Sequence, residues 1–152
     1  MLFSRINRGS PEKVFISVYN SYSTAAITVG QAVMWDFPTD ADGVGVTRPT
    51  ARATNAGMAC AGVVASTSIA AGDYGLVQVY GYHSAARVRT VTGGSPAIVA
   101  GRPLVVNVAG SVFCLESVST ASNTVLTFPI GFSLGATAGF TTAARAAFIR
   151  AL

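Results

Sequence analysis

The chain has 152 residues and a formal net charge of +4; 51% of its residues are hydrophobic and only 11% are charged. This length corresponds to one domain, and the low charge content excludes a chain that is disordered because of its charge. The apolar stretches are interrupted well before the ~18 residues of a membrane-spanning helix, and the N-terminus carries no recognisable secretory signal, so we expect neither a membrane protein nor an exported one.

The chain begins with a polar and basic stretch, residues 1–13, that shows no period of 2 or 3.6 residues. We expect this stretch to be an extended N-terminal arm, followed by one β domain over residues 14–152. From Val14 onward, short segments of β-branched and aromatic residues alternate with turn residues. The predicted strands are 14–19, 31–37, 57–66, 75–82, 86–91, two or three short strands within 97–118, and one within 123–134.

The connections between these segments also have sequence signals. Residues 38–50 are dense in turn residues and are the longest predicted loop, while Ala71–Asp73 is predicted to turn between two strands. Residues 141–152 fit either a capped helix or a closing strand, and we favour the strand because nothing else in the chain reads as helical. Together the pattern predicts an all-β, single-domain sandwich or barrel of short antiparallel strands with an extended N-terminal arm.

The residues that enzymes and metal sites require are sparse. His83 is the only histidine, no nucleophile motif surrounds it, and we expect a structural or solvated loop residue. Cys60 and Cys114 lack C-x-x-C spacing and are interpreted as buried, reduced thiols. Asp40 and Asp42 lie in the predicted 38–50 loop, where Asp side chains bond to their own backbone. The sequence therefore predicts no catalytic site, no cofactor and no metal.

The basic residues are scattered along the sequence rather than gathered on one element, which argues against a nucleic-acid partner. Nine of the ten are Arg, a residue suited to paired contacts at protein interfaces. Within 86–91, Arg87 and Arg89 alternate with Val88, so one side of this segment is expected to face water or a partner. A protein partner is the favoured interpretation.

Two stretches of the chain carry a resemblance. The segment GMACAGVVASTSIAAGDYGLVQVYGYHSAARV (57–88) and the later VAGRPLVV (99–106) resemble small β-rich head proteins of tailed bacteriophages, the capsid decoration or cement proteins. The resemblance implies a structural virion protein that binds the outer surface of an assembled shell of major capsid protein, commonly as a trimer at local three-fold axes. It also implies assembly in the host cytoplasm and stabilisation of the phage head.

The composition is compatible with such a role, because a surface with few charges suits wide and permanent contacts. A free monomer of this composition would leave large apolar patches in water, so we expect a homotrimer or another closed ring. The predicted contacts to the capsid lie in the arm and on one strand face: Phe3, Arg5, Arg8, Lys13, Arg87 and Arg89.

Two other function classes stay open. The first is a glycan- or receptor-binding module on the virion surface, in which Trp35, Tyr80 and Tyr82 would form a platform for stacking sugars. The second is a small β enzyme of unrecognised type. A titratable group with a strongly shifted pKa inside a cleft would favour the enzyme.

Overall fold

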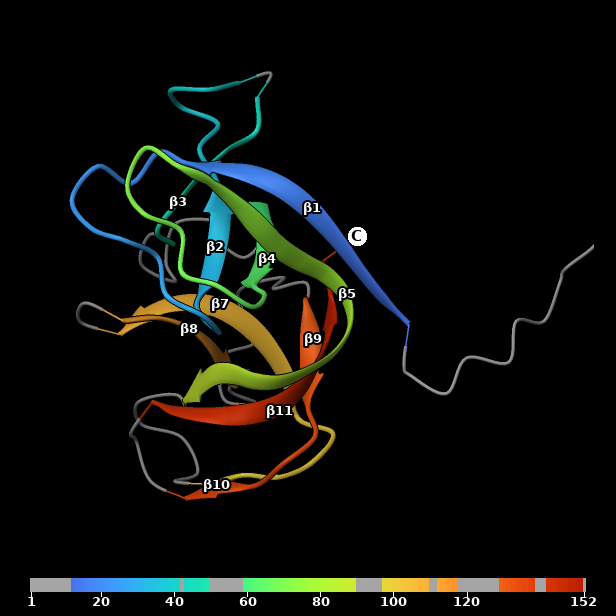
Figure 1. Ribbon diagram of the computed structural model, residues 1–152. Helices are drawn as coiled ribbons and strands as arrows, with labels where there is room; N and C mark the ends of the chain where they lie inside the picture. Colours follow the sequence, from blue (N-terminus) through green and yellow to red (C-terminus); the bar gives the residue numbers. More distant parts are fainter. Residues whose placement is uncertain are drawn as a thin grey trace, which may run out of the picture.

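The structure, a computed structural model, describes residues 12–41, 43–49, 59–89, 97–109, 112–117, 129–138 and 142–151. In this part the chain forms strands and no helix, which confirms the predicted all-β class (Figure 1). The strands are β1 (Lys13–Asn20), β2 (Ala32–Trp35), β3 (Gly45–Thr47), β4 (Cys60–Val64), β5 (Tyr74–Arg89), β6 (Ala97–Ile98), β7 (Pro103–Ala109), β8 (Val112–Ser117), β9 (Gly131–Ser133), β10 (Thr137–Ala138) and β11 (Ala143–Arg150).

The long strand β5 joins two small barrels. The nine-stranded sheet has the order β1-β3-β2-β4-β5-β11-β9-β7-β8, with additional pairings of β5 to β1 and to β8. The first pairing closes the ring β1-β3-β2-β4-β5, and the second closes β5-β11-β9-β7-β8. Figure 1 shows β5 running beside β1 in the upper half and then bending to lie against β11 in the lower half. Closure removes the exposed edges that an open sheet would present.

Each barrel has its own apolar core, and β2 and β4 form the wall between the two cores. Val33 and Val64 belong to the cluster inside the upper barrel, whereas Met34 and Val63 belong to the cluster of the lower barrel. All five residues of β4 are buried, because both of its faces are covered. This explains why CAGVV is a continuous apolar run rather than an alternating one.

Strand β5 passes between β1 and β11 at Gly81, which pairs with Lys13 on one side and with Ile149 on the other. Gly81 has a φ of 100°, a conformation that favours glycine, and a Cβ at this position would overlap the carbonyl oxygen of Glu12. The close approach of β1 to β5 therefore requires a glycine here.

Several predicted elements are confirmed and others need correction. Residues 143–150 form a strand as favoured, and β4 pairs antiparallel with β5 as expected for the two segments that flank Ala71–Asp73. The predicted 38–50 loop contains β3, and 86–91 is not a separate strand, because Ala86–Arg89 is the end of β5. The pairings β1–β3 and β5–β8 are parallel, so the sheet is mixed rather than purely antiparallel.

Candidate functional site

The most distinctive surface in the described part is a group of aromatic side chains on the outside of the lower barrel. Tyr82 on β5, Phe148 on β11 and Phe132 on β9 are register partners across adjacent strands, so they share one face. Tyr80, two residues before Tyr82, contacts the edge of the Phe148 ring, with centroids 5.2 Å apart and an interplanar angle of 84°. We call Tyr80, Tyr82, Phe132 and Phe148 the aromatic face.

This face is packed within itself but open to solvent. The rings of Phe132 and Phe148 stack with centroids 5.2 Å apart and an interplanar angle of 12°. Phe132 is 39% exposed, and Leu134, two residues further along the chain, is 40% exposed. The other three aromatic residues of the face are half-buried. Ring contacts of this kind hold the side chains in fixed positions before any partner arrives, which lowers the entropic cost of binding.

Two cations lie at the edge of the aromatic face. Lys13 Nζ lies 5.9 Å from the centroid of the Tyr82 ring, a cation–π distance. Arg150 is exposed and is the register partner of Tyr80 across β5 and β11. An apolar centre with charged groups at its rim is the usual composition of a protein-binding surface.

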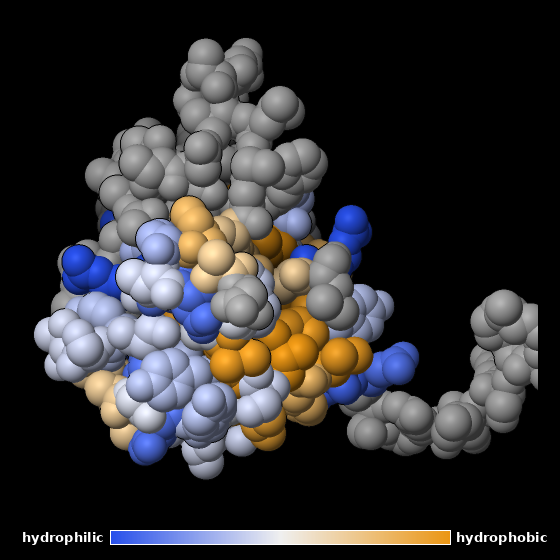
Figure 2. Space-filling view, turned by 90° about the horizontal axis from the view of Figure 1, so that it is seen from above, coloured by the Kyte–Doolittle hydropathy of each residue, from blue (hydrophilic) through white to orange (hydrophobic). Residues whose placement is uncertain are grey.

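Further apolar residues are exposed on the outer side of the β1–β5 pair. Phe15 is 44% exposed and Leu76 is 47% exposed, and alternation along the two paired strands puts them on the same side. Figure 2, a view from above, shows hydrophobic side chains gathered on the side of the molecule where β1 begins. The exposed apolar surface is therefore larger than the aromatic face alone.

Of the predicted capsid contacts that the structure describes, only Lys13 lies at this face. Arg87 and Arg89 are half-buried near the end of β5, and they alternate with the fully buried Val88 as expected. Arg87 lies five residue steps after Tyr82, which corresponds to about 16 Å along a strand, so Arg87 is well separated from the aromatic face. Arg87 Nε is buried and has no hydrogen-bond partner among the described residues. The predicted contacts Phe3, Arg5 and Arg8 lie outside the described residues.

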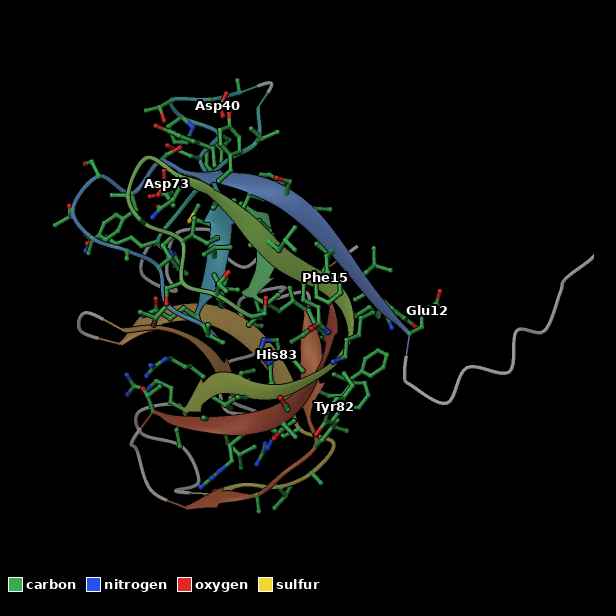
Figure 3. All side chains as sticks on the ribbon, viewed as in Figure 1. Glu12, Phe15, Asp40, Asp73, Tyr82 and His83 are labelled. Carbon is green, nitrogen blue, oxygen red and sulfur yellow. The ribbon has the colours of Figure 1, made fainter. Side chains whose placement is uncertain are left out.

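His83 is not a loop residue, which corrects the expectation from the sequence. It lies within β5, and Figure 3 shows it directed into the molecule while its neighbour Tyr82 points outward. Its Nε2 lies 3.1 Å from the Val64 carbonyl oxygen, and its Nδ1 accepts a hydrogen bond of 3.2 Å from the Ala85 N–H. These partners fit the neutral imidazole, and burial lowers the pKa of His83 below its usual range.

Cys60 is a buried free thiol, as predicted, and burial raises its pKa to about 12. A thiol with so high a pKa is not activated as a nucleophile at neutral pH. The side chain of Cys114 lies outside the described residues. Cys60 is therefore not an activated nucleophile, and backbone groups already occupy both ring nitrogens of His83.

Asp40, the acidic residue of the 38–50 segment that the structure describes, takes part in a local backbone contact. Asp40 Oδ2 accepts a hydrogen bond of 2.8 Å from the Gly45 N–H, which confirms the expected turn role for Asp40. Asp42 lies outside the described residues. Within the residues that the structure describes, no group of three or more His, Cys, Asp and Glu side chains could hold a metal ion.

The proposed sugar platform of Trp35, Tyr80 and Tyr82 does not form as one unit. Trp35 packs against the core cluster of the upper barrel, whereas Tyr80 packs against Phe148. Sequence reasoning missed Phe132 and Phe148 as surface residues, because the face combines three strands that are far apart in the chain. Phe132 and Phe148 each follow or precede a residue that the structure buries, Gly131 and Ile149. Alternation along a strand then places the two aromatic side chains on the opposite, outer face.

A scan against protein-family models and a search of curated proteins find no match to this chain. Across the described ranges, no helix is long and apolar enough to cross a membrane.

Proposed function

We propose that this chain is a structural virion protein that binds the outer surface of an assembled phage capsid and stabilises the head. The aromatic face is the observation that supports this proposal most strongly. Its aromatic rings, partly exposed on a closed barrel and flanked by Lys13 and Arg150, have the composition of an interface core with a charged rim. The resemblance of residues 57–88 and 99–106 to capsid decoration proteins supports the choice of the shell as the partner.

The closure of the sheet is also consistent with a structural role. Two barrels that share β5 leave little of the described sheet unpaired at its edges, where another chain could add a strand. A homotrimer would bury further apolar surface, such as that around Phe15 and Leu76. In this proposal the chain is not an enzyme, and it uses no cofactor or nucleic acid.

Co-sedimentation tests the proposal. The full chain is mixed with assembled shells of the major capsid protein encoded in the same genome, and in parallel with the unassembled capsid subunit. We expect the chain to sediment with shells at saturable stoichiometry and not to bind the isolated subunit. A chain that stays in the supernatant with intact shells contradicts the proposal.

The glycan-binding alternative is favoured by one observation, the partly exposed ring cluster of Tyr80, Phe132 and Phe148. A glycan array separates the alternatives, because a sugar-binding module would give selective signals that are lost when Tyr80 is replaced by Ala. The capsid proposal predicts no selective glycan signal.

A further inference from the structure

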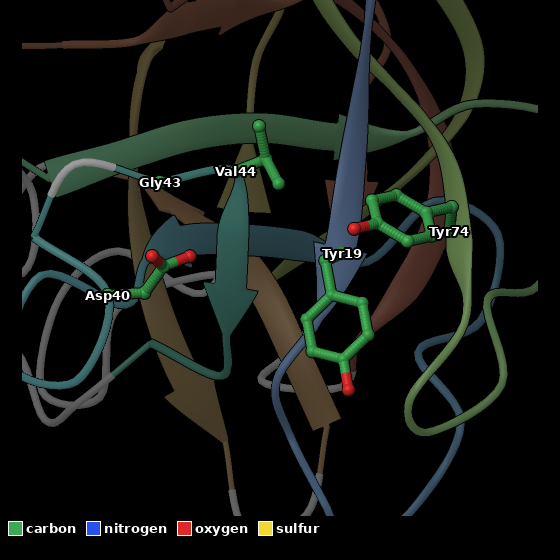
Figure 4. A pocket seen from close by; sticks show the side chains of 5 residues that line it. All are labelled: Tyr19, Asp40, Gly43, Val44 and Tyr74. Atoms are coloured by element: carbon green, nitrogen blue, oxygen red, sulfur yellow. The ribbon is translucent and has the colours of Figure 1, made fainter.

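A second surface feature lies at the other end of β1, away from the aromatic face. Tyr19 lies six residue steps after Lys13, which corresponds to about 20 Å along the strand. A hollow of about 330 Å³ opens to solvent here, lined by Tyr19, Asp40, Gly43, Val44 and Tyr74 (Figure 4). A second hollow of about 370 Å³ lies on the other side of Tyr19 and includes Asp36 and Thr39 in its lining.

A glycine on β3, Gly45, lets the Asp40 carboxylate come close to that strand. Tyr19 is flanked in register by Gly45 on β3 and by Tyr74 on β5. A Cβ on Gly45 would lie 2.6 Å from Asp40 Oδ2, so the carboxylate occupies the space that Gly45 leaves free. The hydrogen bond from the Gly45 N–H then fixes the Asp40 carboxylate at the margin of the hollow.

Two tyrosine rings form the opposite wall. Tyr19 and Tyr74 have ring centroids 5.3 Å apart and an interplanar angle of 55°, so the two rings are tilted toward each other rather than stacked. Tyr74 is 69% exposed, which leaves its ring available to a ligand. Figure 4 shows the two rings on one side of the hollow and Asp40 on the other. Aromatic faces and a fixed carboxylate attract the same kind of group, a cation.

The charges around the two hollows agree with this preference. Asp40 and Asp36 line them, Asp73 directly precedes Tyr74, and no Lys or Arg is among the described lining residues. A carboxylate has about four acceptor positions, and the hydrogen bond from Gly45 occupies only one of those of Asp40. A planar guanidinium can stack on Tyr74 and donate two hydrogen bonds to one carboxylate, which an ammonium group cannot do.

We propose that the hollow between Tyr19, Tyr74 and Asp40 is a binding site for an arginine side chain presented by a partner protein. The tyrosine rings contact the flat face of the guanidinium, and the Asp40 carboxylate accepts its N–H groups. The site does not depend on the capsid proposal, because it uses none of the residues of the aromatic face. Its failure and the failure of shell binding are therefore separate results.

The probe for this site is N-acetyl-arginine amide, titrated into the full chain and followed by NMR of the backbone amides. We expect saturable shifts at Tyr19, Gly45 and Tyr74, and weaker binding at high salt, because the contact is charged and solvent-accessible. The neutral isostere N-acetyl-citrulline amide should give shifts at least about fivefold smaller at equal concentration, since it keeps the shape but lacks the charge.

Matched variants assign the effect to the site. Tyr74→Ala and Asp40→Asn should each weaken binding by about fivefold or more, and Asn can still accept the hydrogen bond from the Gly45 N–H. Val99→Ala is the control, because Val99 is 56% exposed and lines neither hollow; the affinity of this variant should equal that of the wild type. Unchanged amide spectra outside the site verify that each variant is folded.

Three results would overturn the proposal. The first is equal shifts with the citrulline compound, and the second is full binding by the folded Tyr74→Ala variant. The third is the absence of shifts with the arginine compound while a neutral disaccharide gives them, which would make the hollow a sugar site.

Discussion

Replacing Gly81 by Ala tests the close approach of β1 to β5 at the point where β5 pairs with β1 on one side and with β11 on the other. Gly81 has a φ of 100°, and its Cβ position is occupied by the carbonyl oxygen of Glu12. The backbone strain alone costs an alanine about 1–2 kcal/mol. Because backbone atoms cannot rotate away, β1 must also shift and weaken its pairing at Lys13, which adds about 1 kcal/mol for each hydrogen bond lost. We expect a total loss of about 2–4 kcal/mol.

Gly101 provides the matched control. Its φ is 85°, but nothing lies within 4 Å of the position of its Cβ, so Gly101→Ala introduces strain without overlap. We expect this variant to lose only about 1 kcal/mol, since the alanine also restricts the unfolded chain. Urea unfolding measures the free energy of unfolding of both variants. An unchanged slope of this free energy against urea concentration is the evidence of two-state behaviour. If Gly81→Ala loses no more unfolding free energy than Gly101→Ala, the inference that Glu12 lies against Gly81 is wrong.

Three further predictions follow from the buried groups and the arm. Burial lowers the pKa of His83 in the folded state, so the contribution of His83 to stability is complete above pH 6.5 and declines below that value, because the unfolded chain takes up the proton first. The difference in unfolding free energy between the wild type and His83→Gln, measured by urea unfolding, should therefore shrink on going from pH 7.5 to pH 5. A constant difference would exclude this titration. Cys60, whose burial raises its pKa to about 12, should resist iodoacetamide in the native protein and react after denaturation, as peptide mass mapping can verify; rapid native labelling would contradict its burial. Deletion of residues 2–10 should leave the melting temperature nearly unchanged while lowering retention on capsid shells at moderate salt, and unchanged occupancy would remove the arm from the binding surface.

Local signals in the sequence predicted the class of the fold but not its closure. The β-branched and aromatic residues of 14–19 and the apolar run of 57–66 predict strands, because both signals are properties of neighbouring residues. The parallel pairing of Val88 with Leu115, by contrast, joins residues far apart in the chain and has no local signal. The sequence predicts a loop at His83 because this residue lies between the predicted strands 75–82 and 86–91, whereas β5 runs through both and His83 is buried within it.

The aromatic face was beyond local reasoning for the same reason. Tyr82, Phe132 and Phe148 become neighbours only through the register of β5, β11 and β9. Taken one at a time, Phe132 and Phe148 have no sequence signal that distinguishes a surface aromatic from a core aromatic. Lys13 is among the contacts predicted from the sequence, but its neighbours at the surface depend on strand pairings that the sequence does not specify.

The most direct test of the capsid proposal compares two exposed phenylalanines. Phe132 lies in the aromatic face and is 39% exposed, whereas Phe37 lies just beyond the end of β2, away from that face, and is 58% exposed. Both are replaced by Ser, and the retention of each folded variant on assembled shells of the major capsid protein is measured by sedimentation at a series of chain concentrations. We predict that Phe132→Ser weakens binding by about thirtyfold, as expected for a central interface aromatic worth about 2 kcal/mol, while Phe37→Ser binds like the wild type. Equal retention of the two variants would contradict the assignment of the aromatic face as the capsid-binding surface.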